Sequence, residues 1–207
     1  MPVHPLRAKA LRRWRESDPK LHAIARAVPP PAPAYGQGHP FEALVQSIAH
    51  QQVSLQAGQS IFRRVGELGP TPEALLKAGP EKLRAAGLSR PKVAYVLDLA
   101  DKAVTKVVDL DHISTMPDEQ VIEQLTSVKG IGVWTAKMFL LFHLQRPDVL
   151  PHEDLGLQIA VAQHYGVSRK LAAKRIQKMR PAWSPYCSYA SLVLWNSRRV
   201  EMGVKPR

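Results

Sequence analysis

The fold is decided by Leu125-Thr-Ser-Val-Lys-Gly-Ile-Gly-Val-Trp-Thr-Ala-Lys137 together with Leu150-Pro-His-Glu-Asp-Leu-Gly156. Gly130-Ile131-Gly132 predicts a tight turn, because glycine accepts positive φ and lets atoms of another molecule approach closely. The apolar run that follows, from Trp134 to Phe142, predicts a mostly buried helix. The first-turn amides of such a helix lack intrahelical partners and point toward an anion, for which a DNA phosphate is the obvious candidate.

Helical patterns fill most of the chain, whereas the alternating pattern of a half-buried strand is almost absent. Asp18 and Pro19 predict an N-cap and the first residue of a helix that reaches Val28, and residues 29–33 predict a stiff proline-rich linker. Further helices are expected to begin near Pro40, Ser54, Thr71, Ser89, Pro117, Gly132, Asp154, Ser168 and Pro185, with a break at Gly79-Pro80. The helix after Ser89 is expected to bury Val93, Val96, Leu97, Ala100, Val104 and Val107. We therefore expect an all-α fold of ten or eleven helices.

The composition favours a polyanionic partner. The chain carries 29 Lys and Arg residues against 17 Asp and Glu, which gives a formal net charge of +12. Because the basic residues are spread along the chain and do not form a tail, we expect a folded basic face with salt-sensitive binding. The alternative is a soluble protein that is basic without such a partner.

Several classes of protein are excluded. No apolar run approaches the roughly 18 residues of a membrane span, and the N-terminus lacks the apolar core of a signal peptide, so no membrane partner is expected. The single cysteine, Cys187, excludes an internal disulfide and a four-cysteine iron–sulfur cluster. A reducing cytoplasm fits this cysteine usage.

Asp154 has two interpretations from the residues alone. An aspartate at the start of a helix is a good N-cap, and Glu153 beside it could serve too. A carboxylate in an apolar neighbourhood can also stabilise the charge that develops on a sugar, or orient a water, as glycoside hydrolysis requires. The two roles do not exclude each other.

Four segments carry a resemblance to a known family: Ser47-Ile-Ala-His-Gln-Gln-Val-Ser54, Val128-Lys-Gly-Ile-Gly-Val-Trp-Thr-Ala136, Arg146-Pro-Asp-Val-Leu-Pro-His-Glu-Asp-Leu-Gly156 and Trp183-Ser-Pro-Tyr-Cys-Ser-Tyr-Ala-Ser-Leu-Val-Leu-Trp195. In family order they resemble the helix–hairpin–helix (HhH-GPD) DNA glycosylase superfamily. The resemblance is closest to the 3-methyladenine DNA glycosylase II branch, in a compact form without an N-terminal β domain. It implies a two-lobed helical fold with a DNA cleft between the lobes.

The expected organisation is a single glycosylase unit over residues 1–207. Residues 1–39 would form an N-terminal arm, and residues 40–115 the first helical lobe. Residues 116–207 would contain the hairpin, the aspartate and the closing helices.

The resemblance also implies site residues. It assigns base excision to Asp154. The implied DNA contacts are Lys129, Gly130, Gly132 and Thr135 at the hairpin, and Gln52, Val53 and Ser54 in the loop that fills the gap left in the duplex. The implied base pocket contains Trp134, Trp195 and Met138, the last where some relatives have an aromatic residue. No cofactor is required, and a Na⁺ or K⁺ ion is implied on the main-chain carbonyls of Thr126, Val128 and Ile131.

One position indicates the reaction type. Relatives that also cut the strand carry a lysine two residues after the second hairpin glycine, where this chain has Trp134. Without an amine to form a Schiff base, water attacks the sugar and an abasic site remains. Lys137 is expected on a different helix face and is not expected to substitute.

The predicted protein is therefore a monofunctional glycosylase that flips alkylated purines, 3-methyladenine and 7-methylguanine among them, out of damaged double-stranded DNA. It is expected to be a cytoplasmic, nucleoid-associated monomer. The alternatives are another lesion, such as 1-methyladenine or a deaminated purine, and a non-catalytic protein that binds damaged DNA. Ala160 and Cys187 stand where arginine is common in the family, and Cys187 is expected to be a semi-buried helix residue that accepts no alkyl group.

Overall fold

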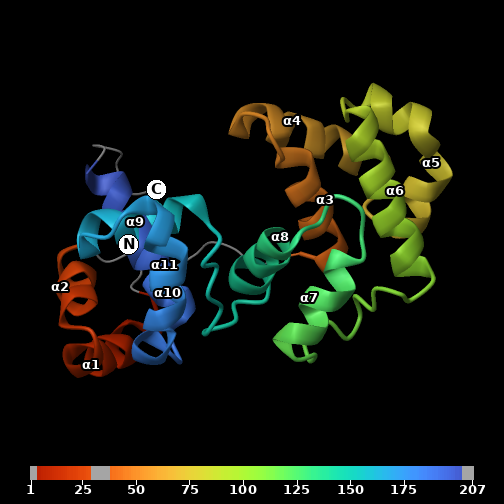
Figure 1. Cartoon of the computed structure of the whole chain (residues 1–207). Helices are drawn as coiled ribbons and strands as arrows, with labels where there is room; N and C mark the ends of the chain where they lie inside the picture. The colour runs from red at the N-terminus through yellow and green to blue at the C-terminus, as the bar shows by residue number, and fades with distance from the viewer. Residues whose placement is uncertain (1–3, 29–37, 202–207) are drawn as a thin grey trace. The chain divides into compact units, whose positions relative to one another are not determined.

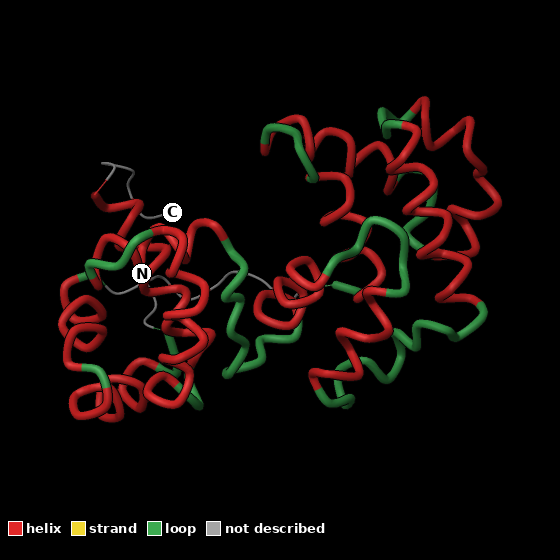
Figure 2. The backbone as a smooth tube through the Cα atoms, in the orientation of Figure 1, coloured by secondary structure: helices red, strands yellow, loops and turns green. Residues whose placement is uncertain are grey.

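A computed structural model describes residues 4–28 and 38–201 of the chain. This part contains eleven α-helices, a short π-helix and no strand (Figure 1, Figure 2). The prediction of an all-α fold is confirmed. The linker predicted at residues 29–33 lies outside the described residues.

The helices form two compact units. Within the described residues, 4–28 and 145–201 make the first unit, and 38–144 make the second. The first holds α1 (Arg7–Ser17), α2 (Pro19–Ala27), α9 (Leu155–Tyr165), α10 (Arg169–Trp183) and α11 (Cys187–Glu201). The second holds α3 (Pro40–His50), α4 (Leu55–Gly66), α5 (Pro72–Ala85), α6 (Arg90–Val104), α7 (Asp118–Thr126), α8 (Val133–Met138) and the π-helix η1 (Phe139–His143). None of the described helices is long and apolar enough to cross a membrane.

This division differs from the boundary expected near residue 115. The hairpin helices α7 and α8 belong with α3 to α6, because α3 packs on η1 and the turn between α7 and α8 is bonded to α6. The N-terminal helices α1 and α2 instead pack against the C-terminal helices α10 and α11.

Most predicted helix starts lie where the capping pattern placed them. Asp18, Ser54 and Thr71 each accept a hydrogen bond from the amide three residues further on. The two short helices expected between residues 71 and 87 form one element, α5, which is kinked where Gly79 takes a φ of +72°.

Two expectations about helices were wrong. Helix α1 was not predicted, because Leu6 at its N-cap offers no side-chain hydrogen bond and the segment is mostly charged. Val104 and Val107, expected on the buried face of α6, are 43 % and 54 % exposed. With 3.6 residues per turn the buried stripe continues to Ala103, and Val107 lies beyond the helix end.

A buried carboxylate joins three helices of the first unit. Asp18 accepts hydrogen bonds from Leu21 N (3.0 Å) in α2, Tyr165 Oη (2.8 Å) in α9 and Trp183 Nε1 (2.8 Å) in α10. Burial, together with the neighbouring Asp18, raises the pKa of Tyr165, so its hydroxyl remains a donor. Trp14 of α1 packs in the same core and donates to Trp183 O at 3.3 Å.

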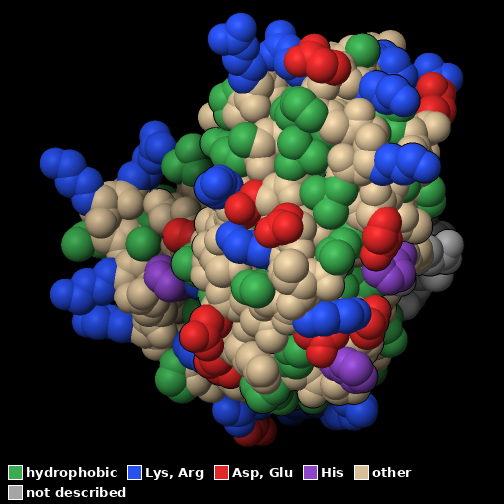
Figure 3. Space-filling view, turned by 90° about the vertical axis from the view of Figure 1, so that its right-hand side faces the viewer, with side chains coloured by type: hydrophobic (Ala, Val, Ile, Leu, Met, Phe, Trp, Pro, Cys, Tyr) green, Lys and Arg blue, Asp and Glu red, His purple; other side chains and the backbone are tan. Residues whose placement is uncertain are grey.

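The net charge is divided unequally between the units. Residues 1–35 and 145–207 contain 18 Lys and Arg and 6 Asp and Glu, whereas residues 36–144 contain 11 of each. The whole excess of +12 therefore belongs to the first unit, although basic residues occur throughout the sequence as expected. Figure 3, which shows the side on which α5 and α6 lie in Figure 1, has Lys and Arg interspersed with Asp and Glu.

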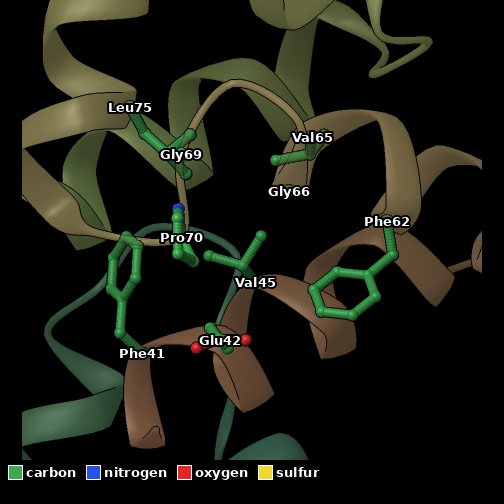
Figure 4. A pocket seen from close by; sticks show the side chains of 9 residues that line it. All are labelled: Phe41, Glu42, Val45, Phe62, Val65, Gly66, Gly69, Pro70 and Leu75. Carbon is green, nitrogen blue, oxygen red and sulfur yellow. The ribbon is translucent and has the colours of Figure 1, made fainter.

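An apolar recess lies in the second unit. It is partly open to solvent (Figure 4). Its lining comes from α3, α4 and α5 and the loop before α5: Phe41, Glu42, Val45, Phe62, Val65, Gly66, Gly69, Pro70 and Leu75. None of the residues predicted for the active site lines it, so it is not the predicted base pocket.

Asp18→Ala is expected to destabilise the protein by about 2–4 kcal/mol, because it leaves the buried donors of Tyr165 and Trp183 without an acceptor. Urea unfolding followed by circular dichroism measures the change. Asp101→Ala, at an exposed position of α6, is the control and should change the free energy of unfolding by less than about 0.5 kcal/mol. Equal effects of the two substitutions would contradict the role assigned to Asp18.

Candidate active site

The Asp154 carboxylate is held through one oxygen by two helices of the first unit. Oδ1 accepts a hydrogen bond from Leu157 N (2.6 Å) and another from Trp195 Nε1 (2.8 Å). The first bond is the N-cap of α9, so the capping interpretation is confirmed. The second comes from α11, 41 residues further along the chain. Asp154 is therefore fixed at a helix start and on a neighbouring helix at the same time.

Gly156 lies against this pair. A Cβ at this position would stand 3.1 Å from Asp154 Oδ1 and 3.4 Å from Nε1 and Cδ1 of Trp195. A side chain there would press on the hydrogen-bonded pair. The small residue thus lets the carboxylate and the indole come together.

The segment before Asp154 is anchored to the start of α11. Ser188 Oγ donates to Arg146 O (2.6 Å) and accepts from Val149 N (3.0 Å). Asp148 accepts from Ser184 Oγ (2.7 Å) and from Cys187 N (3.1 Å). Because α11 also carries Trp195, the same helix positions both the backbone and the carboxylate of the aspartate segment.

Cys187 is fully buried at the first position of α11. Burial, with the adjacent Asp148, raises the pKa of its thiol, which keeps it protonated and weakly nucleophilic. The sequence predicted a semi-buried helix cysteine, and burial disfavours alkyl acceptance as expected.

In the second unit, the hairpin turn packs on an aromatic ring of α6. Gly130 has a φ of +78°, and a Cβ there would lie 2.1–2.5 Å from ring atoms of Tyr95. Gln51 Nε2 donates to Gly130 O at 2.9 Å from a position 79 residues earlier. Glycine is therefore required twice at this position, for the left-handed backbone and for the contact with Tyr95.

A carboxylate of α6 fixes the residue before this glycine. Asp98 Oδ2 accepts from Lys129 N (2.8 Å) and from Lys102 Nζ (2.9 Å), and Lys102 Nζ also donates to Ser127 O. Partial burial would raise the pKa of Asp98, but the bonds from Lys102 and Lys129 outweigh it and hold the pKa below its usual range. Asp98 thus acts as an ionised tether for the turn.

These bonds leave particular turn amides for a ligand. The amide of Lys129 is used by Asp98, and the amide of Ile131 donates to Val128 O at 3.1 Å. Among the described residues, the amides of Gly130 and Gly132 have no internal partner. They are the two amides that the sequence predicted to bind a phosphate.

The remaining predicted residues lie on the short helix α8 and differ in how much of each side chain is exposed. Trp134 is 46 % exposed and Met138 is half-buried, whereas Thr135 is only 7 % exposed. Thr135, a predicted DNA contact, therefore offers little side-chain surface. Lys137 follows Trp134 by three residues, and residues at this spacing are neighbours on one side of a helix. The expectation that Lys137 lies on a different face was therefore wrong.

The loop between α3 and α4 contains the predicted gap-filling residues. Gln52 has a φ of +55°, which is unusual for a residue other than glycine. Val53 beside it is 41 % exposed, and Ser54 is occupied as the N-cap of α4. Through Gln51, this loop is bonded directly to the hairpin turn.

No group of three His, Cys, Asp or Glu side chains among the described residues is arranged to hold a metal ion. The turn itself offers neutral carbonyl oxygens, which suit a hard monovalent cation. Val128 O, one of the three carbonyls implied for Na⁺ or K⁺, also accepts the amide of Ile131.

Comparison with known proteins identifies the family. A model of the HhH-GPD superfamily of base excision DNA repair proteins matches residues 45–185, which contain the hairpin, Asp154 and the start of the last segment. The chain belongs to this superfamily. The HhH-GPD match also contains the Gln51 loop and α6, so the contacts around Gly130 lie within the matched residues.

Two solved HhH-GPD structures are similar over nearly the whole chain. A DNA-3-methyladenine glycosidase from Bacillus halodurans is 32 % identical, with a TM-score of 0.82 over 95 % of this chain and 91 % of that one. The Schizosaccharomyces pombe 3-methyladenine DNA glycosylase Mag1, solved with abasic DNA, is 26 % identical, with a TM-score of 0.76 over 90 % and 95 %. YfjP of Bacillus subtilis is 32 % identical over 76 % of this chain, which spans 58 % of YfjP.

Gly130→Ala is expected to weaken duplex DNA binding more than tenfold and to destabilise the protein by more than the 1–2 kcal/mol of a left-handed alanine, because Tyr95 must also move. Fluorescence anisotropy and urea unfolding measure the two effects. Gly79→Ala is the matched control: it has a similar positive φ but nothing within 4 Å of its Cβ, so it should lose stability and keep DNA affinity. Equal loss of affinity in both variants would contradict a specific role of the turn.

Proposed function

We propose that this chain is a monofunctional DNA glycosylase that hydrolyses the N-glycosidic bond of alkylated purines, 3-methyladenine first, in damaged duplex DNA. The observation that carries the proposal is the hydrogen-bonded pair formed by Asp154 Oδ1 and Trp195 Nε1. The names of the similar proteins from Bacillus halodurans and Schizosaccharomyces pombe support the same substrate class. The enzyme would act as a monomer on the nucleoid in the cytoplasm.

Asp154 is assigned to the chemical step. As the bond between C1′ and the base nitrogen breaks, its electron pair leaves with the base and positive charge develops on the sugar. The carboxylate stabilises that charge and orients a water, whose oxygen bonds to C1′ and whose proton is released. Because Leu157 N and Trp195 Nε1 fix Oδ1, the carboxylate needs little reorganisation during the reaction.

Contact with the flipped base is assigned to Trp195 in the first unit and, separately, to Trp134 and Met138 in the second. Alkylation of a ring nitrogen makes the purine cationic, and the face of an indole attracts a cation. Trp195 uses the N–H at its ring edge for Asp154, so a base would stack on the ring face. Met138 offers an adaptable thioether contact. A cationic base is also a good leaving group, so no separate general acid is assigned.

Binding of the DNA backbone is assigned to the hairpin. The amides of Gly130 and Gly132 would bind a phosphate next to the lesion, with Lys129 nearby, and such contacts position DNA without reading its sequence. Gln52 and Val53 would fill the gap left by the flipped nucleotide, while Ser54 holds the start of α4. Extruding a base costs a few kcal/mol and is easiest where damage weakens its pairing.

A Na⁺ or K⁺ ion is assigned to the carbonyl oxygens of Thr126, Val128 and Ile131. When bound, it would lend positive charge to the same turn that faces the phosphate. Two other functions remain as alternatives: excision of another lesion, and binding of damaged DNA without excision. Identification of the bases released from damaged DNA distinguishes them.

Asp154→Asn is expected to lower the single-turnover excision rate by roughly 10³-fold and to leave DNA binding unchanged, because the amide oxygen still accepts from Leu157 and Trp195 but carries no charge. Release of bases from a methylated duplex, separated by chromatography, measures the rate and identifies the lesion. Glu153→Gln is the matched control and should retain the wild-type rate. Full activity of Asp154→Asn would refute the assignment.

Trp195→Phe separates the hydrogen bond from the ring. The variant keeps an aromatic face but removes the donor to Asp154, so excision should slow by about tenfold to a hundredfold while the cap of α9 remains. Single-turnover kinetics at saturating enzyme measure the change. An unchanged rate would show that the hydrogen bond to Asp154 is dispensable for excision.

Incubation with an abasic duplex and borohydride should trap no covalent adduct and produce no nicked strand, because Trp134 replaces the amine that a Schiff base needs. Denaturing electrophoresis of labelled DNA detects both products. Since Lys137 lies on the same side of α8 as Trp134, Lys137→Ala is the informative control. An adduct in the wild type that disappears in this variant would contradict the monofunctional assignment.

A further inference from the structure

Helix α10 presents a row of lysines in the first unit. Its sequence, Arg169 to Trp183, contains six Lys and Arg residues and no Asp or Glu. The buried side is formed by Ala172, Ile176, Met179 and Trp183. Lys170, Lys174 and Lys178 are exposed at intervals of four residues. We call these three residues the α10 lysine row.

The α10 lysine row has no internal counter-charge. Like charges four residues apart on a helix repel one another and destabilise it. Among the described residues, the one ion pair of an α10 cation is between Arg180 and Asp148, at 3.6 Å, and no carboxylate pairs with any lysine of the row. The row therefore lowers the stability of its own helix, and an external anion would relieve that repulsion.

Neighbouring α1 extends the basic character of this unit. It packs on the end of α10, where Trp14 Nε1 donates to Trp183 O and Ser17 Oγ donates to Ala182 O (2.7 Å). Its Lys9, Arg12 and Arg15 side chains are exposed and carry no ion pair to a described residue. Together with the row, these cations form much of the +12 charge that the first unit carries.

The spacing of the row suits a regular polyanion. With a rise of about 1.5 Å per residue, successive lysines of the row are displaced by roughly 6 Å along the axis. A duplex presents phosphates at close, regular intervals along each strand, so several lysines can engage one backbone. The hairpin should supply less of this attraction, because its unit has no net charge and Lys129 at the turn is paired with Asp98 at 3.8 Å.

We propose that the α10 lysine row is a second DNA-binding surface, which contacts the phosphate backbone of undamaged duplex DNA and supplies much of the salt-sensitive affinity. The inference rests on the proposed function, since it takes duplex DNA as the ligand. It adds a contact that is independent of the lesion, and that would hold the enzyme on intact DNA between encounters with damaged bases.

The test compares two triple variants of the full chain on an undamaged duplex. Lys170→Gln, Lys174→Gln and Lys178→Gln together remove the row. Lys77→Gln, Lys82→Gln and Arg84→Gln remove the same charge from exposed positions of α5 in the neutral unit. Fluorescence anisotropy at several salt concentrations gives the slope of log K against log salt. The row variant should lower the magnitude of this slope by about 3, and the α5 variant by less than about 1.

Equal changes in both variants, or no change in either, would overturn the inference. The charge-preserving variant Lys170→Arg, Lys174→Arg and Lys178→Arg should retain the wild-type slope, and its failure to do so would point to a structural effect and also overturn it. The thermal midpoint of the row variant should not fall, because repulsion is removed. Base release by the wild type is measured separately. Absence of glycosylase activity would contradict the proposed function and leave the binding result unaffected.

Discussion

One oxygen atom, Asp154 Oδ1, accepts the cap hydrogen bond of α9 and the indole hydrogen bond of α11, and the geometry of the candidate site depends on this shared acceptor. The cap bond satisfies an amide that every helix leaves unpaired at its start. The carboxylate is consequently held whether or not DNA is present. Under the proposed function, folding and chemistry would use the same atom, so capping does not compete with catalysis as an explanation of Asp154.

The hairpin is held differently, because three residues from other parts of the second unit contact its turn. Tyr95 packs against Gly130, Asp98 binds the amide of Lys129, and Gln51 binds the carbonyl of Gly130. These contacts consume the hydrogen-bonding groups that face α3 and α6. Among the described residues, the amides of Gly130 and Gly132 remain without an internal partner, so a turn held by these contacts still offers two donors to an anion. A loose turn would lose the entropy of ordering each time it bound a phosphate.

Short sequence patterns predicted the features that depend on neighbouring residues alone, such as helix starts and turns. Proline and capping residues marked most helix starts, the glycine turn marked the hairpin, and Asp154 was recognised as a cap. The contacts that position the site were missed, because they join distant residues: Gln51 and Gly130 are 79 positions apart, and Trp195 and Asp154 are 41 apart. Nothing in either local sequence requires its partner. The burial of Thr135 was not predicted for a related reason, since it depends on how α8 packs.

The unequal charge of the two units has a physical consequence for DNA recognition. Lys and Arg attract a duplex over distances near the Debye length of about 8 Å at physiological salt, and that attraction weakens as salt rises. Hydrogen bonds from turn amides act only at contact and carry no formal charge to be screened. A protein that placed its positive charge at the turn would bind every phosphate strongly there, whatever the state of the adjacent base. With the charge on the other unit, attraction to DNA in general and docking of one phosphate at the turn can be varied separately. Under the proposed function, the contact at the turn would then depend on whether the neighbouring nucleotide is easily extruded.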